Sequence, residues 1–127
     1  MKPIINEWIV KAEGDFYTLA REAQVKKNVN YDGICFHVQQ CVEKYLKARL
    51  CEASIELGKI HDLVALLDQV VKVEPSWESF RADMAFLTEF GVHFRYPGES
   101  ADREDALNAQ KRRLSFRKAA RRALGLE

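Results

Sequence analysis

The chain has 127 residues, of which 47% are hydrophobic and 31% are charged, a composition typical of a globular domain. This length suits a single domain spanning residues 1–127 and excludes two ordinary ones. The 20 Lys and Arg residues nearly balance the 19 Asp and Glu residues, so the overall charge alone indicates neither a nucleic-acid nor a membrane partner.

The first residues of the chain contain no continuous apolar segment, so no signal peptide is expected. No apolar run reaches the length of a membrane span. The three cysteines, Cys35, Cys41 and Cys51, fall within one expected helix and point in different directions, so none should pair with another. We therefore expect a protein of the reducing cytoplasm.

Apolar residues recur at helical spacing in the first quarter of the chain. They predict an amphipathic helix from about Ile4 to Lys27. The stretch Asn28–Asp32 breaks this pattern and supplies cap residues. A second helix is expected from about Asp32 to Ala53.

Three further helices are expected downstream. A short one opens at His61–Asp62, where the carboxylate favours a helix N-terminus. The next starts at Ser76, which can cap it, and ends before Pro97. The last spans about Asp102–Leu124, with Gly125 as its C-terminal cap. No segment alternates as strands do, so we predict an all-α fold, an up-and-down bundle of four to five helices.

On a helical wheel, the second helix carries apolar side chains over more than half of its circumference, so it should contact neighbours on two sides. This apolar arc comprises Ile34, Cys35, Val38, Cys41, Val42, Tyr45, Leu46 and Ala48. Gln39 and Arg49 lie inside it and, if buried, must find hydrogen-bond partners.

The opposite, polar arc of this helix comprises His37, Gln40, Glu43, Lys44 and Lys47. Spacing leaves two interpretations open. The arc is either a solvated face with Glu43 and Lys47 as an i,i+4 ion pair, or a groove whose lysines, glutamine and histidine hold a phosphate or a base.

Two other features also allow a structural and a functional interpretation. Arg95 and Tyr96 either complement a helix end and shape a turn, or bind a phosphate and stack on a base. The basic last helix is either a solvated face or a surface for RNA or an acidic partner. Its cations are Lys111, Arg112, Arg113, Arg117, Lys118, Arg121 and Arg122.

Other chemistries have little support in the sequence. It contains no Gly-rich phosphate loop, no Ser–His–Asp order and no paired catalytic carboxylates. His61 and Asp62 lack further ligands at metal spacing, so neither a metal nor a cofactor is expected. Cys41 faces the expected core, and Cys51 would need an activating base to act as a nucleophile.

The stretch Phe36–Ala48, FHVQQCVEKYLKA, resembles the signature helix of HEPN domains (higher eukaryotes and prokaryotes nucleotide-binding). Three further elements resemble the family in order and spacing, and together the four cover roughly residues 4–120. These elements are the first helix with Trp8, Ala12, Asp15 and Ala20, then His61-Asp62-Leu63 followed by Leu66-Leu67, and finally Arg95-Tyr96-Pro97.

The resemblance implies a helical bundle, often dimeric, that works beside a minimal nucleotidyltransferase in a toxin–antitoxin or defence pair. We therefore expect a homodimeric accessory protein that binds a nucleotide or RNA. The implied binding residues are Gln40, Glu43, Lys44, Lys47, His61, Arg95 and Tyr96.

Some HEPN proteins are metal-independent ribonucleases, which carry an Arg followed by a His after four to six residues. No His follows Arg95 in this sequence, so the family's usual ribonuclease mechanism is not expected. Two alternatives remain. One is a ribonuclease that uses Arg95 with His61 or His93. The other is a purely structural dimerisation module.

Overall fold

A computed structural model describes residues 2–56, 58–93 and 97–126, with the backbone alone for residues 91–93. No strand occurs in these ranges, so the all-α prediction is confirmed. The elements are α1 (Pro3–Ala23), α2 (Tyr31–Glu52), α3 (Leu63–Val70), the 3-10 helix η1 (Pro75–Phe80), α4 (Arg81–His93) and α5 (Arg103–Ala123).

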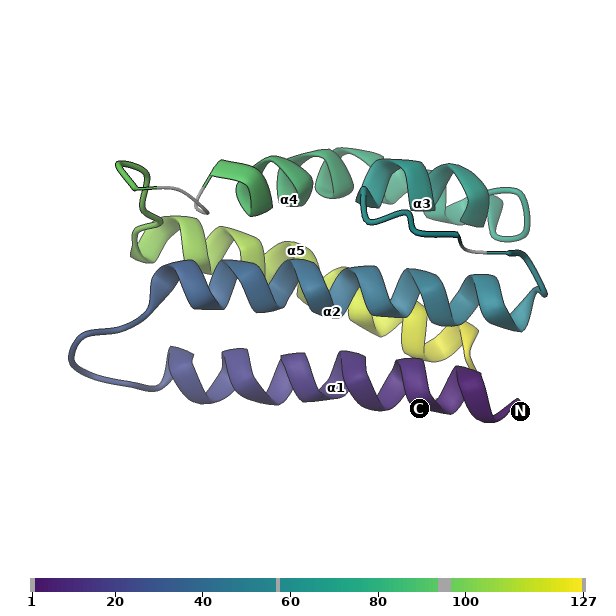
Figure 1. Cartoon of the computed structure of the whole chain (residues 1–127), viewed down its shortest axis with the longest axis horizontal. Helices are drawn as coiled ribbons and strands as arrows, with labels where there is room; N and C mark the ends of the chain where they lie inside the picture. Colours follow the sequence, from purple (N-terminus) through teal and green to yellow (C-terminus); the bar gives the residue numbers. More distant parts are fainter. Residues whose placement is uncertain (1, 57, 94–96, 127) are drawn as a thin grey trace.

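Helix α2 is the centre of the bundle and contacts α1, α3, α4 and α5. In Figure 1, α1 and α2 run antiparallel to one another, and so do α4 and α5, as an up-and-down bundle requires. Every residue of the predicted apolar arc is buried, which confirms that α2 packs against neighbours on more than one side. Within the described ranges, no helix is both long and apolar enough to cross a membrane.

Helix α1 ends at Ala23, four residues before the predicted end at Lys27. A further turn would bury little, because Val25 is already 42% exposed and both lysines after it are exposed. The chain instead turns through Asn28, whose φ of 53° lies in the left-handed region. Helix α2 then starts from Asn30, whose side chain accepts the Gly33 N–H at 2.8 Å.

Aspartates cap two later helices, α3 at the predicted Asp62 and α5 at its predicted start, Asp102. The Asp62 carboxylate accepts two backbone N–H groups of the first turn of α3, at 2.8 and 3.1 Å. Asp102 and Asp105 form a reciprocal capping box at the start of α5. Asp32 has a different role, since it accepts the Ala101 N–H at 2.6 Å and joins the segment before α5 to α2.

The segment before α4 differs from the single helix predicted to start at Ser76. Pro75–Phe80 forms a 3-10 helix, and no side chain caps it. Residues three apart eclipse one another in a 3-10 helix, so Trp77 and Phe80 both reach Phe116 of α5. Their ring centroids lie 5.1 and 5.3 Å from that of Phe116, both in edge-on geometry. The aromatic contact therefore explains the tighter turn.

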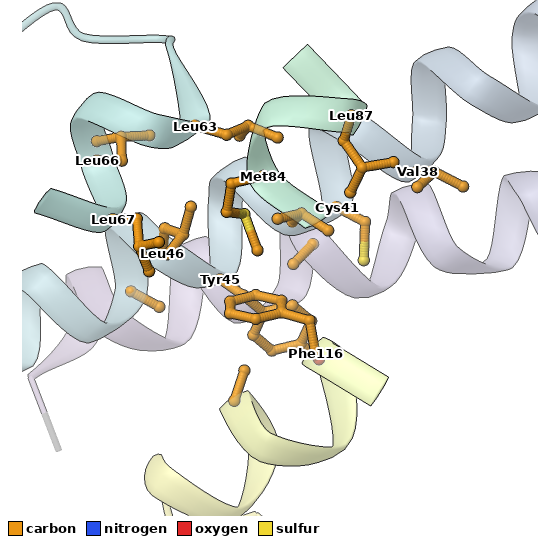
Figure 2. Close-up of a cluster of buried hydrophobic side chains, with 14 of the residues drawn as sticks. Val38, Cys41, Tyr45, Leu46, Leu63, Leu66, Leu67, Met84, Leu87 and Phe116 are labelled. Carbon is orange, nitrogen blue, oxygen red and sulfur yellow. The ribbon is translucent and has the colours of Figure 1, made fainter. Parts of the chain in front are cut away.

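The core is one continuous cluster to which all five α-helices contribute. Figure 2 shows its central part, where side chains of α2, α3, α4 and α5 meet. The residues labelled there are Val38, Cys41, Tyr45, Leu46, Leu63, Leu66, Leu67, Met84, Leu87 and Phe116. This packing fixes the position of the α2 backbone, and with it the positions from which the polar side chains of the opposite arc extend.

Candidate functional site

The Glu43–Lys47 ion pair exists, but it is not solvated. Both residues are only 5% exposed, and the Lys47 Nζ donates to Glu43 Oε2 at 3.0 Å. The same ammonium lies 5.2 Å from the ring centroid of Trp8 on α1. The interpretation of the polar arc as a solvated face is therefore wrong for Glu43 and Lys47, since their two charges are buried and paired.

Lys44 and His37 are held by a carboxylate from the neighbouring helix. Asp15 of α1 is 8% exposed. Its Oδ2 accepts from Lys44 Nζ at 2.5 Å, and its Oδ1 accepts from His37 Nδ1 at 2.8 Å. Neither lysine of the polar arc is thus a free cation, so a phosphate bound at this arc would compete with Asp15 and Glu43 for the two lysines.

His61 approaches α2 from the segment that precedes α3. Its Nδ1 donates to Glu43 Oε2 at 3.1 Å, while 73% of its side chain remains exposed. Glu43 therefore holds both Lys47 and His61. Because the carboxylate occupies Nδ1, the Nε2 of His61 is left for a ligand or a proton.

A hollow of about 290 Å³ lies where His61 meets α2, and we name it the α2 pocket. It is lined by Phe36, Gln39, Gln40, Glu43 and His61. Pockets that take a whole small molecule begin at about this size. The α2 pocket therefore suits one ring of a ligand, with the rest of the ligand outside.

The α2 pocket brings together Gln40, Glu43 and His61 from the predicted binding set. Lys44 and Lys47 are predicted binding residues that do not line it. Arg95 and Tyr96 lie outside the described residues. His93 ends α4, and its side chain also lies outside the described part of the structure.

Two pocket residues, Phe36 and Gln39, were not among the predicted binding residues. A signal for Gln39 was its place inside the apolar arc, where a polar side chain needs a partner. Phe36 is 43% exposed, so it supplies an aromatic surface among polar neighbours. An aromatic residue on the polar side of a helix was the available signal for this position.

Gln39 is 7% exposed, and its side-chain oxygen has no hydrogen-bond donor among the described residues. Arg49, the other polar residue of the apolar arc, is satisfied, since its Nε donates to Glu74 at 3.2 Å. A buried polar atom without a partner costs free energy. Gln39 therefore lines the α2 pocket and has a buried oxygen without a described donor, which a small movement of the carboxamide would present to a ligand.

A second charged cluster joins α1, α2 and α5. The Glu13 carboxylate accepts from the Tyr45 hydroxyl, from Arg117 Nη2 at 2.9 Å and from Arg121. Burial alone would raise the pKa of Glu13, but the hydrogen bonds and the two guanidinium groups outweigh it and hold that pKa below the ordinary value of 4.5. Glu13 is thus a structural anion that bridges three helices.

Glu13→Gln is expected to lower the free energy of unfolding at pH 7 by about 1.5–3 kcal/mol, the usual net contribution of a hydrogen bond to a charged group. Because the folded-state pKa of Glu13 is depressed, its contribution is complete above pH 4.5 and is lost as the pH falls through the folded-state value. Urea unfolding at pH 7, 5 and 3 should show the difference between the two proteins narrowing as the pH falls. A difference that does not depend on pH would contradict this role.

Neither buried cysteine is a suitable nucleophile. Burial raises the pKa of the Cys35 and Cys41 thiols to about 12, far from the thiolate that nucleophilic attack needs. All three cysteines are free thiols. Across the described residues, no group of three His, Cys, Asp or Glu side chains gathers to form a metal site.

The architecture defines a class: a small all-helical bundle whose central helix bears lysine and histidine side chains held by carboxylates beside a pocket. The family model of the HEPN domain matches residues 5–123. The chain therefore belongs to the HEPN domain family, as the resemblance predicted, and this membership supports a function related to nucleotides or RNA. A comparison with curated proteins and another with solved structures each found no match.

Proposed function

We propose that this HEPN protein binds a nucleotide, or one nucleotide of an RNA chain, with its base in the α2 pocket. The observation that carries the proposal is Gln39, a buried amide that lines the pocket and has an unpartnered oxygen. A base edge supplies the N–H groups that such an oxygen needs. A half-turn of the carboxamide would present its nitrogen instead, so Gln39 could bond either to a donor or to an acceptor on the edge of a base.

The other lining residues support a base and not a phosphate. Phe36 is exposed enough to stack on a ring. Gln40 adds a second amide, and the Glu43 carboxylate is already bonded to Lys47 and His61. Since Lys47 is neutralised by Glu43, the phosphates of the ligand would remain outside the pocket, near the exposed His61.

The test is a calorimetric titration of the full chain with ATP, GTP, CTP and UTP, followed by the variants Gln40→Ala and Phe36→Ala. Each variant should weaken binding about tenfold, the effect of one lost hydrogen bond to the ligand or one lost stacking contact. Gln69→Ala on α3 is the matched control, because Gln69 lies outside the α2 pocket. No binding by the intact chain, alone or as a dimer, rules the proposal out.

Two wider parts of the proposal rest on the family. The protein acts as a homodimer, and it pairs with a minimal nucleotidyltransferase in a toxin–antitoxin or defence system. A small nucleotidyltransferase gene beside this one, and a complex of the two proteins on size-exclusion chromatography, would support the pairing. Light scattering of the purified chain tests the dimer.

A ribonuclease is the second candidate, and the geometry of His61 favours it. A carboxylate fixes Nδ1 and leaves Nε2 as a general acid or base, the arrangement that acid–base catalysis requires. This activity would cleave RNA in the presence of EDTA and disappear in His61→Ala. Intact RNA after long incubation with micromolar protein excludes it.

A further inference from the structure

A second hollow, of about 400 Å³, lies at the C-terminal end of α5 and shares no residue with the α2 pocket. It is lined by Arg117, Lys118, Arg121, Arg122 and Leu126, and we name it the basic pocket. Among residues 2–56, 58–93 and 97–126, no acidic side chain lines it. Its only apolar residue is Leu126, so it offers no aromatic surface on which a base could stack.

Three of the cations that line the basic pocket, Arg117, Lys118 and Arg121, outnumber the described carboxylates that pair with them. Arg117 and Arg121 both pair with a single carboxylate, that of Glu13. Lys118 is exposed and makes no ion pair with any described residue. Within the described part of the chain, one carboxylate thus pairs with the three cations Arg117, Lys118 and Arg121, and the charge left over attracts an anionic ligand.

The two arginines are fixed in place before any ligand arrives. Glu13 binds Arg117 through Nε and Nη2, and the Arg117 guanidinium carbon lies 4.0 Å from the ring centroid of Phe16. Glu13 also binds Arg121 through Nη1. Both arginines line the basic pocket, and guanidinium groups match the oxygens of a phosphate.

The ordinary explanation of the cations covers only part of this arrangement. Basic residues complement the negative end of a helix, and one or two in the last turn are enough for that. Here the run from Lys111 to Arg122 contains seven basic residues and no acidic one. Helix complementation accounts neither for the hollow nor for the arginines anchored on Glu13.

We infer that the basic pocket binds the phosphate groups of an RNA chain, independently of the sequence of its bases. The lack of an aromatic surface directs contact to the sugar–phosphate backbone. Family membership favours RNA over an acidic protein as the polyanion. This site is separate from the proposed base site, so either assignment can fail alone.

The test uses the full chain and a labelled, unstructured 12-nucleotide RNA, with fluorescence anisotropy at several KCl concentrations. Lys118→Gln should weaken binding about fivefold at 0.1 M salt and reduce the slope of log K against log salt by about 0.7, because one counterion-releasing contact is lost. Lys111→Gln is the matched control, since Lys111 lies two turns earlier on the same helix and does not line the basic pocket. An equal loss in both variants, or in neither, overturns the inference.

Glu13→Gln supplies a change of opposite sign. It removes the carboxylate that competes for Arg117 and Arg121, so RNA should bind more tightly even though the fold is less stable. A purely structural cluster would give a lower melting temperature without tighter binding, and that result would contradict the inference.

Two further arms identify the ligand and separate the two sites. A poly-glutamate peptide that binds through Lys118 while RNA does not would assign the basic pocket to a protein partner and overturn the inference. Gln40→Ala should weaken binding of a single nucleotide but leave the salt dependence of RNA binding unchanged. Lys118→Gln should do the reverse.

Discussion

Phe116→Ala is expected to lower the free energy of unfolding by about 3–5 kcal/mol, the cost of removing a fully buried aromatic side chain from a packed core. Phe116 is 0% exposed, and the rings of Trp77 and Phe80 meet it edge-on. Its loss leaves a cavity at the point where η1 packs on α5. Urea unfolding at pH 7 measures the effect directly.

Leu114→Ala on the same helix is the control for this prediction. Leu114 is 44% exposed, so its truncation should change the free energy of unfolding by no more than about 0.5 kcal/mol. The two substitutions change the helix propensity of α5 to a similar extent, but only Phe116→Ala removes a buried side chain. Similar losses in both variants would contradict the prediction, because they would show that the burial of Phe116 is not what sets the cost.

Local signals in the sequence were sufficient for the helices whose ends depend on neighbours along the chain. Asp62 and Asp102 cap α3 and α5 because their carboxylates reach N–H groups two or three residues away. The apolar spacing of α2 likewise specifies which residues are buried, since periodicity is a property of the helix alone. Such features need no knowledge of the rest of the fold.

The structure was harder to predict where contacts between residues far apart in the sequence determine the local conformation. The 3-10 helix at Pro75–Phe80 follows from the position of Phe116, which lies far along the sequence. In the same way, a helical wheel gives the direction of Lys44 but not the carboxylate of Asp15 that lies opposite. The polar arc of α2 therefore resembled a solvated face or an open groove, whereas α1 closes over much of it.

The candidate site was predictable only in part for the same reason. Gln40, Glu43 and His61 were chosen on the resemblance to the family, and the structure brings these three together around the α2 pocket. Phe36 and Gln39 belong to the same pocket, but their contribution depends on where the segment before α3 crosses α2. That crossing is a tertiary feature with no local signal.

Glu43→Ala is expected to destabilise the protein by about 3–5 kcal/mol, because it leaves the buried ammonium of Lys47 without its counter-charge. Lys47 is 5% exposed, and Glu43 is the carboxylate to which it is bonded. Lys47→Met should cost less, because Glu43 then still accepts a hydrogen bond from His61. Urea unfolding of both variants tests this asymmetry.

The double variant Glu43→Leu with Lys47→Met completes the comparison. It replaces both buried charges by apolar side chains of similar volume, so most of the stability lost in Glu43→Ala should return. A double variant as unstable as Glu43→Ala would show that Glu43 stabilises the fold through His61 or the pocket wall, and not by neutralising Lys47.

The Lys47→Met variant also separates two modes of nucleotide binding. If Lys47 held a phosphate, the variant would lose affinity for a nucleoside triphosphate and retain it for the nucleoside. A base in the α2 pocket predicts nearly equal affinities of the variant and the native chain for the triphosphate, because Phe36, Gln39 and Gln40 are unchanged. Since the variant should remain folded, its titration tests how the α2 pocket recognises a ligand without the confusion of lost structure.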